Sequence, residues 1–267
     1  LLYTVDTAEG AGYTVITPPQ VYLSGQTFHG DADQIWNWVD QHASQADAMV
    51  LSTDSLIYGG LVDSRKHNLS VDTLTQRVKR IAELHQKYPN VPIYGFGTVM
   101  RSPRASGGGV EPTYYDTYGP TIFQIAALQD KLDAGQISAE EENKLFSLMA
   151  TVPVSYLQDW FNRRQKNMVV NKELIDETRQ GVFSYFALGH DDTSQLSQSA
   201  LESRYLKEYS KGLPPTVYDS FPGADQLGLL LMARYHVIKN NLHPTFEVIY
   251  PLGGGAETIP HYEDQTI

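Results

Sequence analysis

The chain of 267 residues contains no cysteine, which excludes disulfide bonds, cysteine-based zinc sites and catalytic thiols. It also lacks an apolar run of about 18 residues, the length that a membrane-crossing helix needs, so we expect no membrane span. Its first residues do not resemble a signal peptide. These absences leave the location open between the cytoplasm and export after removal of a signal.

Positive charge is scarce, because 20 Lys and Arg stand against 31 Asp and Glu and give a net charge of −11. Proteins that bind nucleic acids or anionic membranes need a basic surface, so we expect neither partner. With 41% hydrophobic and 19% charged residues, the composition is that of a globular protein. The length suits one α/β domain over residues 1–267, which we expect to be part of a longer chain. The oligomeric state is left open.

Six short apolar runs predict β-strands separated by helices. They lie near residues 1–5, 13–16, 48–53, 93–99, 182–188 and 245–250. Strands that alternate with helices favour an α/β fold with a mainly parallel sheet and flanking helices. For this chain we expect a distorted or incomplete (β/α) barrel.

Capping patterns and apolar spacing predict helices after Asp31 and Ser70 and near 121–133, 138–150, 153–168, 171–179, 199–210 and 224–240. Asn171 is expected to cap the short helix that ends at Arg179. Residues 101–120 are rich in glycine and proline and predict a long loop, a feature that is often functional. The region 121–180 then reads as a helical insertion.

Polar side chains follow the predicted strands. They are Asp6, Asp54, Arg101, and Asp191 with Asp192. Because the carboxyl ends of parallel strands lie at one edge of a sheet, we expect these residues to converge on one site.

The stretch from Val182 to Glu202 carries the strongest signal, because its apolar run breaks into Gly189-His190-Asp191-Asp192. Two close carboxyls do not ionise independently, so one is driven toward the acid form near neutral pH. Asp191 and Asp192 are therefore the expected catalytic acid/base pair. Successive strand side chains point to opposite faces, so we expect the strand to end near Leu188 and Gly189 to turn both acids toward one cleft. An Asx-turn that simply ends the strand is the structural alternative.

Further side chains are candidates for substrate binding. They are Asp54, Arg65, Arg101, Glu111, Arg163, Asn167, Asn171, His190 and Glu202. Each has a structural alternative. Arg65 and Arg101 could bind an anion or a sugar, or could tether acidic loops. Glu202 also fits a capping box with Ser199, and a helix face carrying Arg163 and Asn167 is often solvated.

Several blocks of sequence occur in one order: STDSLIYGGLVDSR (Ser52–Arg65), GFGTVMRSPR (Gly95–Arg104), EPTYYDTYG (Glu111–Gly119), DWFNRRQKNMVVN (Asp159–Asn171), GHDDTSQLSQSALESR (Gly189–Arg204), PGADQLGLLLMAR (Pro222–Arg234) and GGGAETIPHYEDQTI (Gly253–Ile267). Together they resemble the bacterial family called domain of unknown function 4127, over nearly the whole chain. Members of that family are longer on the C-terminal side. The resemblance implies no activity, because the family name carries none.

A shorter likeness is local. The segment FALGHDDTSQ (Phe186–Gln195) resembles the strand-end Asp-Asp of β-N-acetylglucosaminidases of the O-GlcNAc hydrolase kind. This resemblance implies that Asp191 orients the acetamide of the substrate and that Asp192 is the general acid.

We therefore expect a carbohydrate-active hydrolase that uses no cofactor and acts on a carbohydrate or other small-molecule substrate. One alternative is a hydrolase dependent on a divalent cation, with Asp6, Asp54 and the Asp pair as oxygen ligands for Mg²⁺, Mn²⁺ or Ca²⁺. The other is a non-catalytic module that binds a sugar or a peptide.

Overall fold

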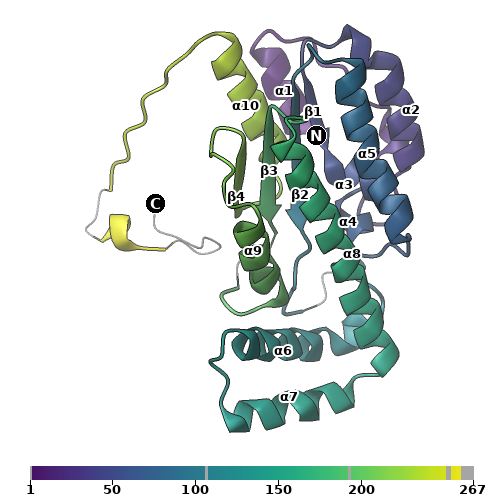
Figure 1. Cartoon of the computed structure of the whole chain (residues 1–267), viewed down its shortest axis with the longest axis vertical. Coiled ribbons are helices and arrows are strands. Elements are labelled where there is room, and N and C mark those ends of the chain that lie inside the picture. The colour runs from purple at the N-terminus through teal and green to yellow at the C-terminus, as the bar shows by residue number, and fades with distance from the viewer. Residues whose placement is uncertain (1, 106–107, 192–193, 251–253, 260–267) are drawn as a thin grey trace.

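The computed structural model describes residues 2–105, 108–191, 194–250 and 254–259 (Figure 1). In this part of the chain one sheet contains β1 (Met49–Ser52), β2 (Ile93–Val99), β3 (Tyr185–His190) and β4 (Tyr218–Pro222). Neighbouring strands are parallel throughout, in the order β1-β2-β3-β4. The prediction of a parallel sheet with flanking helices is confirmed, whereas closure into a barrel stays a prediction.

Helices precede, separate and follow the strands. In chain order they are α1 (Leu2–Gly10), α2 (Ala32–His42), α3 (Thr53–Tyr58), α4 (Leu61–Ser64), α5 (Val71–Lys87), α6 (Tyr115–Asp133), α7 (Ala139–Thr151), α8 (Val154–Arg179), α9 (Gln198–Tyr209) and α10 (Leu227–Lys239). The predicted caps at Asp31, Ser70 and Ser138 are all present, and Glu141 completes the capping box with Ser138. Among the described helices, none combines the length and apolar character that a bilayer crossing requires.

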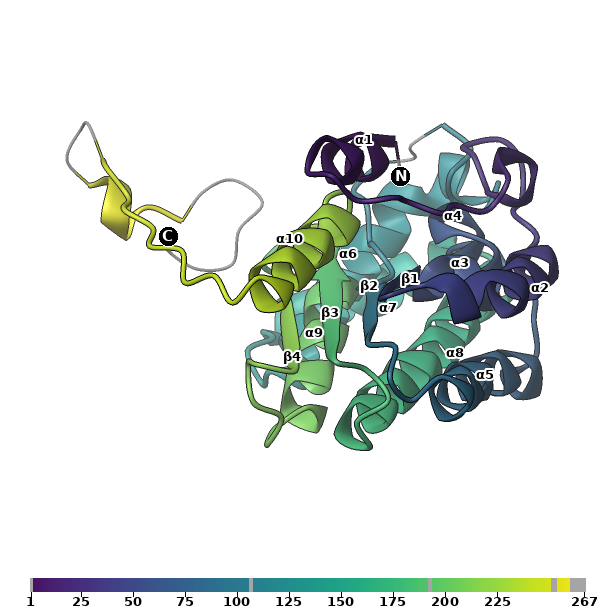
Figure 2. The same cartoon turned by 90° about the horizontal axis from the view of Figure 1, so that it is seen from above.

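The two faces of the sheet bury different side chains, because successive strand residues point in opposite directions. On one face Phe186 and Leu188 join the main core with side chains of α2, α3, α5 and α8. On the other face Tyr185 and Ala187 pack with residues of α10, such as Leu231. Figure 2 shows α10 on one side of the strands and α5 and α8 on the other. The sheet is thus the middle layer of three.

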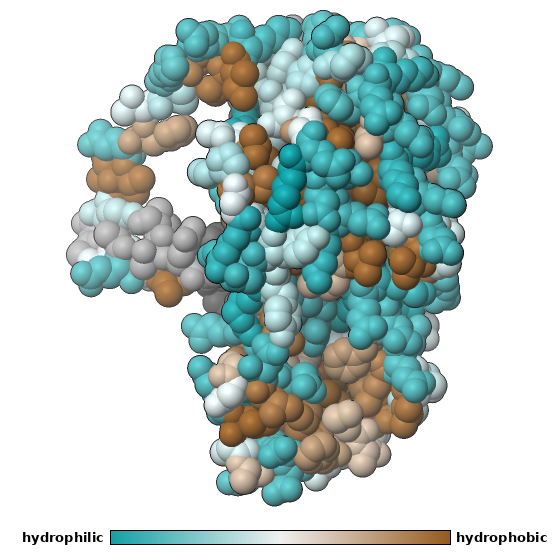
Figure 3. All heavy atoms as spheres, viewed as in Figure 1, coloured by the Kyte–Doolittle hydropathy of each residue, from teal (hydrophilic) through white to brown (hydrophobic). Residues whose placement is uncertain are grey.

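Helices α6 and α7 form a hairpin with its own hydrophobic cluster, which also includes the first turns of α8. In Figure 1 this hairpin lies at the bottom, and α8 runs from it up to the sheet. Figure 3 shows brown surface over the same region, where Phe146 and Val154 are exposed.

Three predicted strands are wrong. Residues 1–5 belong mostly to α1, and residues 13–16 and 245–250 have no regular structure. The last of these segments follows α10 and runs away from the sheet (yellow in Figure 1), with Phe246 and Ile249 exposed. An apolar sequence forms a strand only where a neighbouring strand offers hydrogen bonds. Strand β4 was not predicted, because Tyr218–Pro222 contains an Asp and a Pro, residues depleted in strands but tolerated at a sheet edge.

Two boundaries also differ from the prediction. Helix α6 begins at Tyr115, so the loop after β2 is shorter than expected. Helix α8 runs through Asn171 without a break, because its buried face continues with Val170 and Leu174. Asn171 is therefore an interior residue of a long helix and not the cap of a short one.

Strand β3 does not end near Leu188, as predicted, but pairs as far as His190. Gly189 lies within the ladder, and a Cβ atom there would come 2.2 Å from the carbonyl oxygen of Gly223. The glycine is thus required for close approach of the chain that follows β4, and not for a turn in β3.

Candidate functional site

Asp54 lies at the carboxyl edge of the sheet because β1 leads directly into α3. Ser52 ends the strand and caps the helix by accepting a hydrogen bond from the backbone N–H of Ser55, which places Asp54 in the first turn. Its carboxyl group is buried and accepts a hydrogen bond of 2.9 Å from Thr98 Oγ1 of β2. Burial raises the pKa of Asp54 to about 7, against the lowering effects of Thr98 and Arg65, and the charge of Asp191 raises it further.

Arg65, which follows α4, reaches the end of β3. Its Nη2 atom donates a hydrogen bond to Asp191 Oδ2, and the two groups form an ion pair. Its Nη1 atom lies 3.7 Å from Glu111 Oε1. Arg65 is 5% exposed, whereas the side chain of Asp191 is 21% exposed. The ion pair therefore lies at the carboxyl edge of the sheet, and Asp191 is its more solvent-accessible member.

Arg101 and Glu111 lie at the two ends of the loop after β2. The Nε and Nη2 atoms of Arg101 lie 2.6 and 2.5 Å from the same oxygen, Glu111 Oε1. Glu111 is buried, although a loop glutamate would ordinarily be solvated. Its carboxylate thus contacts both arginines of the edge cluster, which we define as Asp54, Arg65, Arg101, Glu111 and Asp191.

Glu202 contacts this cluster indirectly, through Arg164, a residue that the sequence analysis did not identify as a candidate. The two side chains form a bidentate pair with both N···O distances at 2.7 Å. Arg164 also donates to the backbone carbonyls of Met100 and Arg101, at 2.6 and 2.9 Å. The pair therefore fixes the chain where it leaves β2 and positions Arg101. Its sequence signal was the helical spacing of Arg164, Asn167 and Asn171 on one face.

The other candidates on α8 contact protein groups. Asn167 Nδ2 donates to the carbonyl of Ser64 at 2.9 Å, and its Oδ1 accepts from His67 Nε2 at 2.8 Å. Asn171 Nδ2 lies 3.5 Å from the carbonyl of Thr98. Arg163 pairs with Asp159 and donates to the carbonyl of His67. These contacts hold the segment before α5 and the end of β2 against α8.

His67 and His190 differ in their surroundings. Burial lowers the pKa of His67 to about 4, and its hydrogen bond to Asn167 only partly opposes this effect. His190 Nε2 lies 2.7 Å from Ser220 Oγ on β4. His190 therefore links β3 to β4 at the residue just before Asp191. Asp192 lies outside the described residues.

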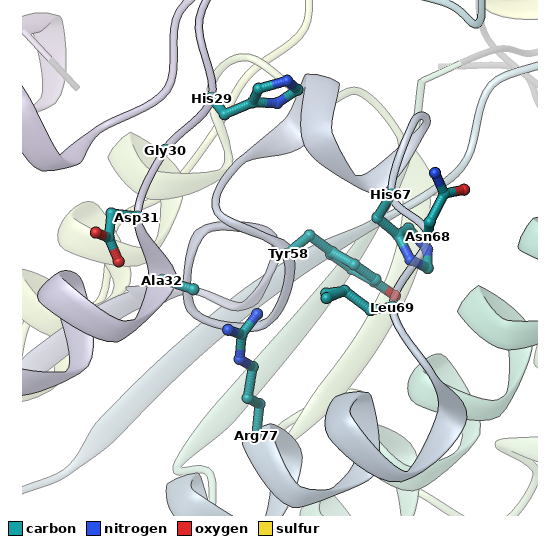
Figure 4. Close-up of a pocket in the computed structure, with 9 residues that line it drawn as sticks. All are labelled: His29, Gly30, Asp31, Ala32, Tyr58, His67, Asn68, Leu69 and Arg77. Carbon is teal, nitrogen blue, oxygen red and sulfur yellow. The ribbon is translucent and has the colours of Figure 1, made fainter.

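Two surface depressions are formed by other residues of the described chain. One, of about 480 Å³, is lined by Tyr58, His67 and Arg77 among others; Figure 4 shows the rings of Tyr58 and His67 close together, with His29 apart from them. The other, of about 420 Å³, contains Lys66, Tyr114, Tyr156, Asp159 and Arg163. Neither is lined by Asp54 or Asp191. The second adjoins the cluster along the chain, because Lys66 follows Arg65 and Pro112 follows Glu111.

The described residues contain no group of at least three His, Asp or Glu side chains arranged to hold an ion, and Asp192, one of the expected ligands, lies outside them. Asp6, one of the expected ligands, lies exposed on α1 and not at a strand end. The expected shared edge is otherwise present, because Asp54, Arg101 and Asp191 all lie where their strands end.

Neither a curated protein nor a solved structure matches this chain. A family model described as "Protein of unknown function (DUF4127)" matches residues 1–267. The chain therefore belongs to this family.

Proposed function

We propose that the protein is a hydrolase that acts on a carbohydrate substrate through carboxyl groups at the carboxyl edge of its sheet. The observation that carries the proposal is the contrast between Asp54 and Asp191. Asp54 is buried and has a pKa of about 7, whereas Asp191 is ion-paired with Arg65, which stabilises its negative charge. Two carboxyls in environments that favour opposite protonation states are the usual pair for acid–base catalysis.

Hydrolysis of a glycosidic bond needs this combination. One carboxyl group donates a proton to the leaving oxygen, and the other acts as a base or a nucleophile in its ionised form. Asp54 suits the proton donor because a pKa near the working pH favours proton transfer in both directions. Asp191 suits the ionised partner. Asp192, the proton donor that the sequence suggests, stays a second candidate for that role.

The carbohydrate class rests on two supports. The first is the local Asp-Asp pattern of Phe186–Gln195. The second is the depression beside the cluster, where the rings of Tyr114 and Tyr156 stack at 4.8 Å and Tyr156 is 36% exposed. The partly exposed Tyr156 side chain offers apolar contact, and Asp159 in the same depression offers a carboxylate acceptor, a combination that suits a sugar ring.

A panel of chromogenic aryl glycosides tests the proposal. We expect turnover that survives EDTA and that Asp54→Asn or Asp191→Asn lowers by about a hundredfold or more, the usual contribution of a general acid or base. Asp72→Asn, a carboxyl removed from the exposed surface of α5, should leave turnover unchanged. If Asp54 is the acid, kcat/KM should fall as the pH rises through about 7.

The same panel distinguishes the alternatives. Turnover that disappears with EDTA and returns with Mn²⁺ would favour the metal-dependent hydrolase. Loss of activity in Asp192→Asn alone, with Asp54→Asn unaffected, would move the proton donor to Asp192. Absence of turnover on every glycoside, together with sugar binding, would favour the non-catalytic module.

A further inference from the structure

Arg65 is buried with fewer hydrogen bonds than its guanidinium can make. Nη2 donates to Asp191, but Nη1 lies 3.7 Å from Glu111 Oε1, beyond hydrogen-bond distance. Its Nε atom is fully buried and has no hydrogen-bond partner among the described residues. A buried donor without an acceptor costs free energy, and in a native protein it commonly marks a place where a ligand or a water binds.

Arg101 contacts the same carboxylate as Arg65 but is more accessible to solvent. Its side chain is 24% exposed, and two of its nitrogens contact Glu111 Oε1. One carboxylate oxygen of Glu111 is therefore the shared counter-charge of two guanidinium groups. The positive charges of Arg65 and Arg101 also repel each other, and this repulsion is among the effects that lower the pKa of Arg65, after burial.

We propose that Arg65 and Arg101 bind an anionic substituent of the saccharide substrate, a carboxylate or a phosphate, and that the carboxylate of Glu111 holds the same position when no anion is bound. Guanidinium groups match both anions, because their planar N–H donors can engage two oxygens at once. This inference rests on the proposed function and adds the substrate class to it. The anion lies beside Asp54 and Asp191 in the same cluster.

Glu111 and the ligand then compete for the two arginines. The proposal therefore predicts that two substitutions change the affinity for an anionic sugar in opposite directions. Glu111→Gln removes the competing charge, so an anionic sugar should bind more tightly. Arg101→Gln removes a charged donor, so the same sugar should bind more weakly. A purely structural role for the three side chains does not produce this pair of opposite effects.

Thermal unfolding over a series of ligand concentrations measures this binding, because a ligand of the folded state stabilises it by RT ln(1 + L/Kd) at a free ligand concentration L and so raises the melting temperature. The ligands are glucuronate and glucose 6-phosphate, with glucose as the neutral control. The variants are Arg101→Gln, Arg101→Lys and Glu111→Gln. Arg104→Gln is the matched control, because it removes an exposed positive charge from the same loop and contacts only the Phe123 ring among the interactions described.

We expect at least one anionic sugar to bind about tenfold or more tightly than glucose, which is the scale of a hydrogen bond to a charged group. Arg101→Gln should abolish this preference, Arg101→Lys should reduce it, Glu111→Gln should increase it and Arg104→Gln should leave it unchanged. The stronger of the two ligands identifies the anion as a carboxylate or a phosphate.

Equal binding of all three sugars, or a preference that survives Arg101→Gln, would overturn the inference. Because binding is measured without turnover, its outcome is separate from that of the proposed function. Anion binding by a protein that hydrolyses no glycoside would contradict only the proposed hydrolase activity. Hydrolysis of glycosides without a preference for anionic sugars would contradict only this inference.

Discussion

Arg65 and Asp191 are 126 residues apart in the chain, yet they form an ion pair at the carboxyl edge of the sheet. Arg65 follows α4 on the β1 side, and Asp191 follows β3. The pair therefore joins two segments that the strand ladder alone does not connect.

Removal of one partner should be costly, because buried Arg65 would keep only Glu111, which lies 3.7 Å away and is shared with Arg101, as a counter-charge. We expect Asp191→Ala to lower the free energy of unfolding by about 3–5 kcal/mol, the usual effect of breaking a buried pair. Urea unfolding at neutral pH measures this loss. Asp72→Ala, at an exposed position, should cost much less, and an equal effect of both substitutions would show that the pair has no special role.

The raised pKa of Asp54 makes stability depend on pH. The unfolded carboxyl releases its proton near pH 3.8, but the folded one keeps it up to about 7. The stabilisation is therefore complete below pH 3.8 and is lost as the pH rises to about 7. The loss amounts to about 4 kcal/mol, because one pKa unit corresponds to about 1.4 kcal/mol.

Asp54→Asn removes this titration, so its stability relative to the wild type should improve as the pH rises from about 4 to about 8. Urea unfolding at several pH values gives the difference directly. A difference that stays constant over this range would show that Asp54 titrates with an ordinary pKa.

His67 should have the opposite dependence. The unfolded imidazole binds a proton near pH 6.5, whereas the folded one does so only near pH 4. Stability is therefore full above pH 6.5 and is lost as the pH falls toward 4, by about 1–2 kcal/mol once solvent contact of the partly exposed ring is discounted.

In His67→Gln this acid-side loss should be absent, so the stability of the variant relative to the wild type should rise as the pH falls from about 6.5 to about 4. His85→Gln, on α5, is the matched control. Equal pH profiles of the wild type and His67→Gln would contradict the lowered pKa.

Gly189 should not accept a side chain. A methyl group there would meet the carbonyl oxygen of Gly223 and the Leu227 side chain, so we expect Gly189→Ala to cost about 1–3 kcal/mol or more through overpacking. Gly228→Ala, in the first turn of α10, is the control, because its methyl group would meet Thr4 and Phe96 at ordinary van der Waals distances and should cost no stability. Thermal unfolding of both variants tests the contrast, and a neutral Gly189→Ala would refute it.

The inner strands β2 and β3 are predictable because burial on both faces of a sheet selects continuous apolar runs such as Ile93–Val99. The edge strand β1 is only partly buried but also has an apolar run. Edge strand β4 was missed because its short, polar sequence has no such signal. Residues 245–250 show the converse, since an apolar run without a neighbouring strand stays irregular. Strand pairing is a long-range property that local composition does not contain.

For the site, parallel topology predicts the shared edge, and the sequence offers Asp54, Arg65, Arg101, Glu111 and Asp191 as candidates. Their partners could not be predicted, because the end of a strand fixes a place but not the reach of a side chain. The burial of Asp54 under Thr98 depends on the register of β1 and β2. The pairing of Glu202 with Arg164 depends on the path of α8 past the end of β2.

Helix α8 contributes to two of the three hydrophobic clusters in the described part of the chain. Leu157 and Trp160 pack in the α6–α7 hairpin, whereas Leu174 and Ile175 pack in the main core. Its 26 residues correspond to a length of about 39 Å. The α6–α7 hairpin therefore cannot move away from the sheet unless α8 also leaves its packing in the main core. We therefore expect the two clusters to unfold together, because α8 belongs to both and α6 is also tied to α9 by the ion pair of Asp130 with Arg204.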